Sequence, residues 1–281
     1  MAVRADDAVK TYRYVRLTMV VLVLGLAASI VVERLKVHPG CFQHSISAYY
    51  YTPVRGMFVG GLVAVGACLI AVRGNSDVED AILNLAGVLA PVVAFVPTPE
   101  PGSCTSTPGT YATRSQDAFN GISALFVLLA IAIVVAAVLL RGQAGPHPAE
   151  WLLLGLGVAL WVAALLVFAS SRAFFLRNAH YTAACTMFAA FFAVVVRNAF
   201  GFHASEKAHG RRARHPLTNR YAVIAGLMVA GGGGIAVWDW TVGWDHAVLF
   251  VEGTLITLFG TFWVLQTQEL WNGGVREERL S

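Results

Sequence analysis

Residues 118–140 read AFNGISALFVLLAIAIVVAAVLL, a run without a single charged side chain. A helix needs about 20 predominantly apolar residues to cross the hydrocarbon core of a bilayer, which is roughly 30 Å thick. The run shows no alternation of polar and apolar residues at a period of two, so a barrel strand is not expected here. The segment therefore predicts a membrane-spanning helix.

The rest of the chain has the same character. Of its 281 residues, 57% are hydrophobic and only 13% are charged, and the mean hydropathy is +0.65. Soluble globular domains carry about 25% charged residues. This composition excludes a disordered chain, and it excludes a soluble enzyme because such a protein could not cover its surface with polar groups. We therefore expect a single transmembrane domain over residues 1–281.

Seven further segments resemble the first in length and apolar content. Together they predict an all-α, polytopic membrane bundle of about eight transmembrane helices. The expected spans are Leu17–Val32, Gly56–Val72, Ala81–Val96, Ala118–Leu140, Trp151–Ala169, Tyr181–Val196, Tyr221–Trp238 and Ala247–Leu265.

The positions of Lys and Arg in the short loops predict the orientation. With the N-terminus in the cytoplasm, 14 of the 20 Lys and Arg residues fall on the cytoplasmic side and six on the outer side. We therefore expect both termini in the cytoplasm. The cytoplasmic parts would be an N-terminal segment over 1–16, a basic loop over 197–220 and a tail over 266–281.

The basic loop over 197–220 carries six Lys and Arg residues and three histidines. A site for anionic lipid headgroups would account for this charge. A topogenic signal that holds the flanking spans in place also accounts for it, and we favour that explanation. No interleaved aromatic residues or nucleic-acid-binding motif accompany the charge, so membrane lipids are the expected partners and nucleic acid is not.

The topology also sorts the four cysteines. Cys41 and Cys104 fall in two outer loops, whereas Cys68 and Cys185 fall within spans. Disulfides persist in the oxidising compartment outside the cell membrane. We therefore predict a Cys41–Cys104 disulfide, with two free thiols as the alternative.

Two spans carry small residues at every fourth position, a spacing that lets helix backbones approach closely. These residues are Gly56, Gly60, Ala64 and Cys68 in the second span, and Gly226, Ala230 and Gly234 in the seventh.

Ionisable groups inside a membrane are costly, and each is a candidate functional residue. Glu252 lies about five residues into the last span, and Asp245 precedes it by one heptad, which places both on one helix face. Other polar residues gather at the same expected depth, whereas the inner halves of the spans are nearly bare of charge. The further candidate ligand-binding residues are Tyr50, Arg55, Asp117, Asn120, Arg172, Arg177, His180 and Tyr181. They predict a polar pocket open to the outer face; a buried structural hydrogen bond is the rival role for Glu252.

The segment Ser45–Gly60, SISAYYYTPVRGMFVG, resembles the signature of a bacterial family of multi-pass membrane proteins with no established activity. The resemblance extends to residues 84–87 (NLAG), 95–98 (FVPT), 122–126 (ISALF), Glu252 and 259–263 (FGTFW). Members of that family often carry an acid after the arginine of the first motif and a histidine before the ISA segment. Gly56 and Asn120 stand at those places here. The resemblance implies a bacterial plasma (inner) membrane and supplies no mechanism or cofactor.

Three functions are compatible with these residues. The first is a binding or accessory protein that holds a lipid headgroup or small solute in the outer pocket, with Arg55, Arg172 and Arg177 facing an anionic group. A further function, ranked third after the hydrolase described next, is a transporter, in which Pro91 or residues 231–234 would interrupt a helix.

The second is a membrane-embedded, metal-dependent hydrolase. Its metal would be held by His180, Asp245, His246 and Glu252, with His44 as a further candidate, and a bound water would be the nucleophile. The spread of Ser, Asp and His over several helices resembles, in outline, the alkaline-ceramidase and progestin-receptor superfamily. No H-E-x-x-H motif accompanies it.

Overall fold

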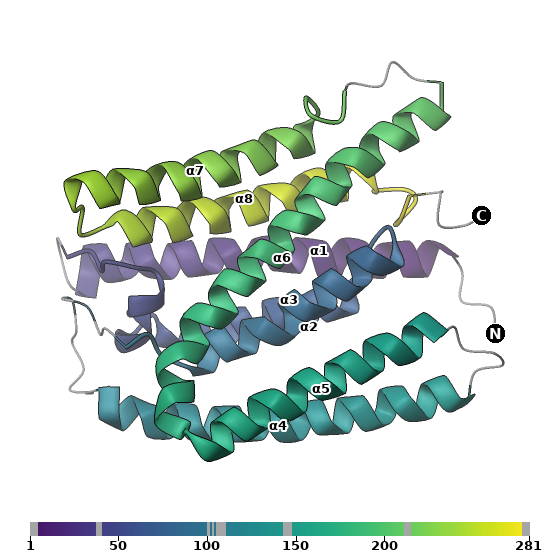
Figure 1. The fold of residues 1–281 in the computed structure, drawn as a ribbon. Coiled ribbons are helices and arrows are strands. Elements are labelled where there is room, and N and C mark those ends of the chain that lie inside the picture. The colour runs from purple at the N-terminus through teal and green to yellow at the C-terminus, as the bar shows by residue number, and fades with distance from the viewer. Residues whose placement is uncertain are drawn as a thin grey trace.

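The computed structural model describes residues 5–37, 41–99, 102, 104, 111–142, 148–210 and 215–276. In this part of the chain all regular structure is helical, with no strand. The long helices are α1 (Ala5–Val32), α2 (Arg55–Ala71), α3 (Asp77–Phe95), α4 (Tyr111–Gly142), α5 (Pro148–Ser170), α6 (Arg172–Ala208), α7 (Arg220–Val242) and α8 (Ala247–Glu269) (Figure 1). A π-helical turn, η1 (Glu33–Val37), continues α1, and a short 3-10 helix, η2 (Ser47–Tyr51), precedes α2.

The predicted all-α class is confirmed for the described residues. Among the described residues, six helices are long and apolar enough to cross a membrane, namely α1, α3, α4, α5, α6 and α8. The apolar helix α2 is shorter, with 17 residues, and the corresponding apolar stretch of α7 is Arg220–Ile235. Each of the expected spans corresponds to a helix of its own, and only Val72 and Val96 fall one residue beyond the ends of α2 and α3.

The long helices run between two ends of the molecule (Figure 1). At one end, called here the termini end, α1 begins, α8 ends and α2 turns into α3. At the opposite end, called the disulfide end, lie η2, Cys41, Cys104 and the turn between α7 and α8. The longest helix, α6, crosses the bundle obliquely from the disulfide end to the termini end.

The centre of the bundle is built around α3, which packs against both α2 and α6, while α1 packs against α2 and α8. The closest backbone approach joins α2 to α3. A Cβ atom added to Gly66 would lie 2.6 Å from the Gly87 carbonyl oxygen, and one on Gly87 would lie 2.7 Å from that of Gly66. Only glycine fits at this crossing.

The predicted stripes of small residues do not make such contacts. A Cβ atom added to any glycine of the two stripes would meet nothing within 4 Å; these are Gly56, Gly60, Gly226 and Gly234. The expectation of close helix packing there was wrong, because the four-residue spacing places small residues on one face without saying whether that face meets a neighbour.

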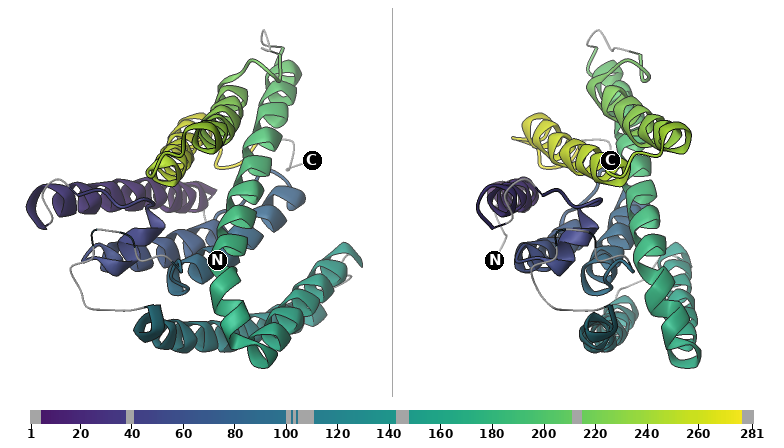
Figure 2. Two further views of the ribbon diagram at one scale, coloured as in Figure 1. Left: turned by 60° about the vertical axis from the view of Figure 1, so that its left-hand side comes forward. Right: turned by 90° about the vertical axis from the view of Figure 1, so that its left-hand side faces the viewer.

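The α4–α5 hairpin lies at the side of the bundle (Figure 2). Within the apolar 18-residue stretch of each helix, only 11% of the residues of α4 and 6% of those of α5 are buried inside the protein. Its outward side chains are aliphatic, such as Val127 and Leu160, which are more than half exposed. A surface of this kind suits lipid tails and not water, because it offers no hydrogen-bonding groups.

Three expected boundaries are corrected. The N-terminal segment 1–16 is helical from Ala5, and the basic loop over 197–220 is helical as far as Ala208. Over its described part, the tail over 266–281 begins within α8, which continues to Glu269, and it contains the buried side chain of Arg276.

Candidate functional site

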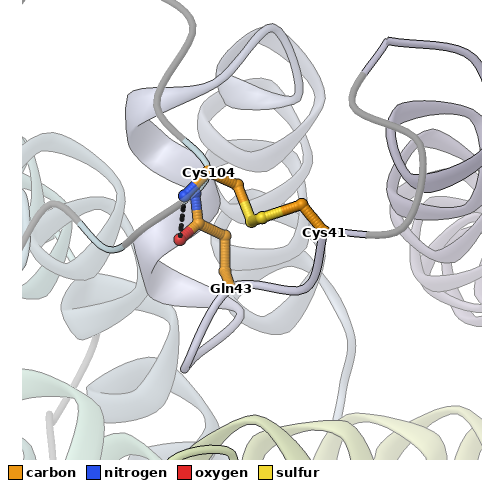
Figure 3. The surroundings of a disulfide bond; sticks show 3 residues. All are labelled: Cys41, Gln43 and Cys104. Carbon is orange, nitrogen blue, oxygen red and sulfur yellow. Dashed lines mark hydrogen bonds between the residues drawn. A yellow bond between two sulfur atoms is a disulfide. The ribbon is translucent and has the colours of Figure 1, made fainter.

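A disulfide joins Cys41 to Cys104 and confirms the predicted pairing, with a Cα–Cα distance of 5.9 Å (Figure 3). Beside it the buried side chain of Gln43 accepts a hydrogen bond from the Cys104 backbone N–H at 3.5 Å. The disulfide ties the connection between α1 and α2 to the chain that follows α3.

Glu252 of α8 points at the start of η2. Its carboxylate accepts hydrogen bonds from the backbone N–H of Ile46 at 2.5 Å, from that of Ser47 at 3.2 Å and from the Ser47 hydroxyl at 2.9 Å. N–H groups in the first turn of a helix have no partner within the helix, so an acceptor here satisfies them. The structural role considered for Glu252 is therefore present, and it explains why serine suits position 47.

Tyr50, Arg55 and Asp117 are brought together as expected. The Arg55 guanidinium donates to the Tyr50 hydroxyl at 3.0 Å and to Asp117 at 3.1 Å, and its carbon lies 4.6 Å from the centre of the Tyr50 ring. Arg114 donates to the same Asp117 oxygen at 3.3 Å. Burial raises the pKa of Tyr50, against the lowering effect of Arg55. The group links η2 and α2 to α4.

His180 and Tyr181 of α6 bind the end of α3 instead of facing Glu252. The His180 ring lies 2.6 Å from the Val96 carbonyl oxygen through Nδ1. The Tyr181 and Thr98 hydroxyl oxygens lie 2.9 Å apart, and the Tyr51 hydroxyl donates to the Thr98 carbonyl at 2.6 Å.

The remaining predicted residues do not converge on one place. Asn120, Arg172, Arg177 and Asp245 are exposed, and Arg172 lies with its guanidinium carbon 4.0 Å from the Phe119 ring centre. Asp245 belongs to the turn before α8, so it does not share a helix face with Glu252 as expected.

The alternative prediction of a metal site is not supported either, because its four proposed ligands do not converge. His246 packs edge-on against the Phe42 ring at 6.4 Å, and the described residues include no group of three His, Cys, Asp or Glu side chains that could hold a metal ion. The structure does not bring together His180, Asp245, His246 and Glu252.

The pocket beside Glu252 is apolar, not polar as predicted. A cavity of about 90 Å³ lies between α1, η2, α2, α3, α6 and α8. Its walls are apolar side chains such as Leu26, Val65 and Phe191, and the polar residues in its lining are Ser47 and Glu252. The arrangement is an apolar chamber with hydrogen-bonding groups at one end.

The termini end holds a buried polar cluster that the sequence analysis missed. Asn198 of α6 donates to Glu79 of α3 at 3.0 Å, and its oxygen accepts hydrogen bonds from Gln266 of α8 at 3.1 Å and from Asn75 at 3.3 Å. Glu79, Asn198 and Gln266 are all at most 2% exposed. These side chains connect three helices in the interior.

A second part of this cluster surrounds Glu269. Its carboxylate is bound by Arg276 at 2.8 Å, by Arg220 at 2.9 Å and by the Tyr221 hydroxyl. Although burial lowers the pKa of Arg276, the neighbouring Glu269 carboxylate raises it overall, so the guanidinium remains charged. Arg16 of α1 is buried as well and donates to the Gly274 carbonyl at 2.7 Å.

The charged residues of this cluster, among them Arg16, Glu79 and Glu269, lie just outside the expected spans, so the inner halves of the spans are nearly bare of charge as expected. The unexpected finding is that these side chains are buried against one another instead of facing water. One local signal was available, since Ser76-Asp77-Val78-Glu79 has the pattern of a capping box. The Ser76 hydroxyl does accept a hydrogen bond from the Glu79 N–H, at 3.2 Å. The Glu79 carboxylate turns instead toward α6, which no local pattern indicates.

Comparisons of the chain with protein-family models, curated proteins and solved structures found no match. The resemblance to the bacterial family stays a prediction.

Proposed function

We propose that the chain is an eight-span binding protein of a bacterial plasma membrane, with both termini in the cytoplasm. In the central cavity it would hold the apolar part of an amphiphilic ligand, whose polar end meets Glu252 and Ser47. The excess of basic residues in the expected cytoplasmic loops supports the orientation. The position of the start of α1 and the end of α8 at the same end of the bundle supports an even number of crossings.

The observation that carries the proposal is the placement of a single carboxylate at one end of an apolar cavity. Ligand sites are typically apolar, with a few polar groups that fix orientation. An ionised carboxylate offers about four acceptor positions, and three hydrogen bonds from η2 already use Glu252. The acceptor position that remains on Glu252 suits a ligand group that donates a hydrogen bond, such as a hydroxyl or an amide.

An anionic headgroup suits this cavity less well than the sequence suggested. The charge of Arg55 is engaged by Asp117, and the cavity lining includes Glu252 but no basic residue. A negative group beside Glu252 would meet like charge in a place with little water. We therefore propose a neutral, hydrogen-bond-donating head.

Transport has less support from the geometry. Helix α3 runs unbroken through Pro91, and α7 continues through Gly231–Gly234. The discontinuous helices typical of many secondary transporters are thus not present at the two positions where the sequence suggested them.

Two adjacent glycines of α2 provide a matched test. Gly61 lines the cavity, whereas Gly60 is exposed and outside it, and a Cβ atom at either position meets nothing within 4 Å. Gly61→Phe should fill the cavity and Gly60→Phe should not. The measurement is thermal stabilisation of the purified full chain by butan-1-ol, a hydroxyl-bearing probe small enough for the cavity, because a ligand that binds the folded state raises its stability.

We expect stabilisation by butanol in the wild type and in Gly60→Phe, and none in Gly61→Phe. Glu252→Gln should weaken butanol binding by about fivefold, because a hydrogen bond to a neutral acceptor is weaker than one to a charged acceptor. Equal stabilisation of both glycine variants would contradict the proposed site.

A further inference from the structure

A second apolar hollow lies on the opposite side of α6 from the α3 contact, between α6 and α7. It has a volume of about 440 Å³ and is lined by Phe192, Val196, Ala199 and Phe200 of α6, Pro216 and Leu217 of the following turn, and Ala222, Ala225, Gly226, Val229 and Ala230 of α7. Along α6 the lining extends over nine residues, from Phe192 to Phe200, which is a rise of about 12 Å. Its rim is exposed, with Phe200 at 52% and Leu217 at 68%.

The face of α6 that lines this groove changes from apolar to polar side chains toward the termini end. Phe192, Val196 and Phe200 are spaced by four, and the same face continues to His203 and Lys207 at steps of three and four. His215, next to Pro216 in the groove lining, brings its ring centroid to 6.5 Å from that of His203. An apolar groove thus leads directly to cationic and titratable side chains.

The charge of this region is strongly one-sided. Residues 197–220 include six Lys and Arg residues and three histidines, and Glu206 is their one acid. A molecule that matches both the groove and this charge has an apolar chain and an anionic head. An apolar protein helix would match the groove but not the positive charge beside it.

We propose that the groove between α6 and α7 binds an acyl chain of an anionic phospholipid, with its phosphate headgroup beside His203, Lys207 and His215. This site is separate from the cavity at Glu252. The basic residues can also act as a topogenic signal. That role depends on how many of them there are and not on the groove beside them, so the two explanations are compatible.

Two matched pairs of variants test the site. Gly226 lines the groove, Gly234 lies on the same helix outside it, and a Cβ atom at either meets nothing within 4 Å. Lys207 and Lys10 are both exposed lysines at the termini end, and only Lys207 continues the groove face of α6. Because both lysines are exposed, their replacement by Gln leaves the packing of the helices intact.

The purified full chain in detergent would be titrated with dioleoyl phosphatidylglycerol and, separately, with dioleoyl phosphatidylcholine, and bound lipid counted by native mass spectrometry. We expect preferential binding of the anionic lipid. Gly226→Phe should weaken it about tenfold, the equivalent of roughly two buried methylene groups, and Gly234→Phe should not. Lys207→Gln should weaken it about fivefold, and Lys10→Gln should not.

Equal binding of the two lipids, or equal binding by Gly226→Phe and Gly234→Phe, would overturn the proposal. Displacement of the lipid by millimolar inorganic phosphate would overturn it too, since the head alone would then carry the affinity. A dimer that dissociates in Gly226→Phe would identify the groove as a contact between copies. Gly61→Phe should leave this binding unchanged, so failure of the cavity proposal and failure of this one give different results.

Discussion

The two ends of the bundle use polar side chains in different ways. At the disulfide end, Glu252, His180 and Tyr51 bind backbone groups of loops and short turns, and the Arg55–Asp117 pair is 32% and 47% exposed. At the termini end, polar side chains bind one another across helices, and Glu269 and Arg276 are only 12% and 4% exposed. Most of these polar contacts at the disulfide end anchor loops, whereas most of those at the termini end join helices.

This difference has energetic consequences. An exposed ion pair contributes about 0–1 kcal/mol, whereas removal of one partner from a buried pair costs about 3–5 kcal/mol because the other charge remains buried. The sequence directs attention to the disulfide end, because its acids and aromatic residues are conspicuous there. The termini end is where single substitutions should damage the fold most.

The largest effect is expected for Glu269→Gln. The substitution leaves Arg276 and Arg220 without their carboxylate in the buried cluster, so unfolding should become easier by about 3–5 kcal/mol. SDS titration of the protein in mixed micelles would measure the change. Glu150→Gln removes an exposed acid at the start of α5 and is the control. A loss below about 1 kcal/mol would mean that the cluster behaves like a surface pair.

The second effect concerns the disulfide end. Cys41→Ser together with Cys104→Ser removes a link that closes a 63-residue separation, and stability should fall by about 2–4 kcal/mol. Cys185→Ser, which replaces an exposed free cysteine, is the matched control. The wild type should also change its mobility on a gel after reduction, and the double variant should not. Identical mobility with and without reductant would contradict the bond.

Asn198→Ala should cost less, about 2 kcal/mol. It removes the hydrogen bonds to Glu79, Gln266 and Asn75 and leaves buried polar groups unsatisfied. Asn178→Ala is the control on the same helix, since the exposed Asn178 side chain binds only the Phe174 carbonyl of its own turn among the described contacts. If both variants unfold alike, the three-helix cluster does not stabilise the bundle.

The smallest effect is expected for Asp117→Asn, below about 1 kcal/mol, because the pair with Arg55 is exposed and screened. The loss should shrink further in high salt. Asp245→Asn, another exposed acid at this end, should show no salt-dependent change. A loss as large as that of Glu269→Gln would remove the contrast between the two ends.

Much of the fold followed from local patterns. The apolar runs predicted the helices because crossing a bilayer requires length and apolarity that single segments display. The Cys41–Cys104 bond followed from topology alone, because only those two cysteines fell outside the spans. The grouping of Tyr50, Arg55 and Asp117 was also expected from their common depth.

The cavity and the buried cluster could not be predicted in this way. Glu79 and Glu269 stand at helix ends and Asn198 lies just beyond the expected span Tyr181–Val196, where a polar residue usually faces water or a headgroup. That they face one another depends on how α3, α6 and α8 cross. Likewise, Gly66 and Gly87 meet while Gly60 and Gly234 face outward, although their local sequences look alike.

The sequence by itself therefore determined the membrane class, the helical segments, the disulfide and the presence of an acid within the last span. The tertiary structure alone decided that Glu252 faces an apolar cavity and that the termini end carries a buried polar cluster. The physical reason is that hydropathy is a property of one segment, whereas the partner of a buried polar group is chosen by the packing of several.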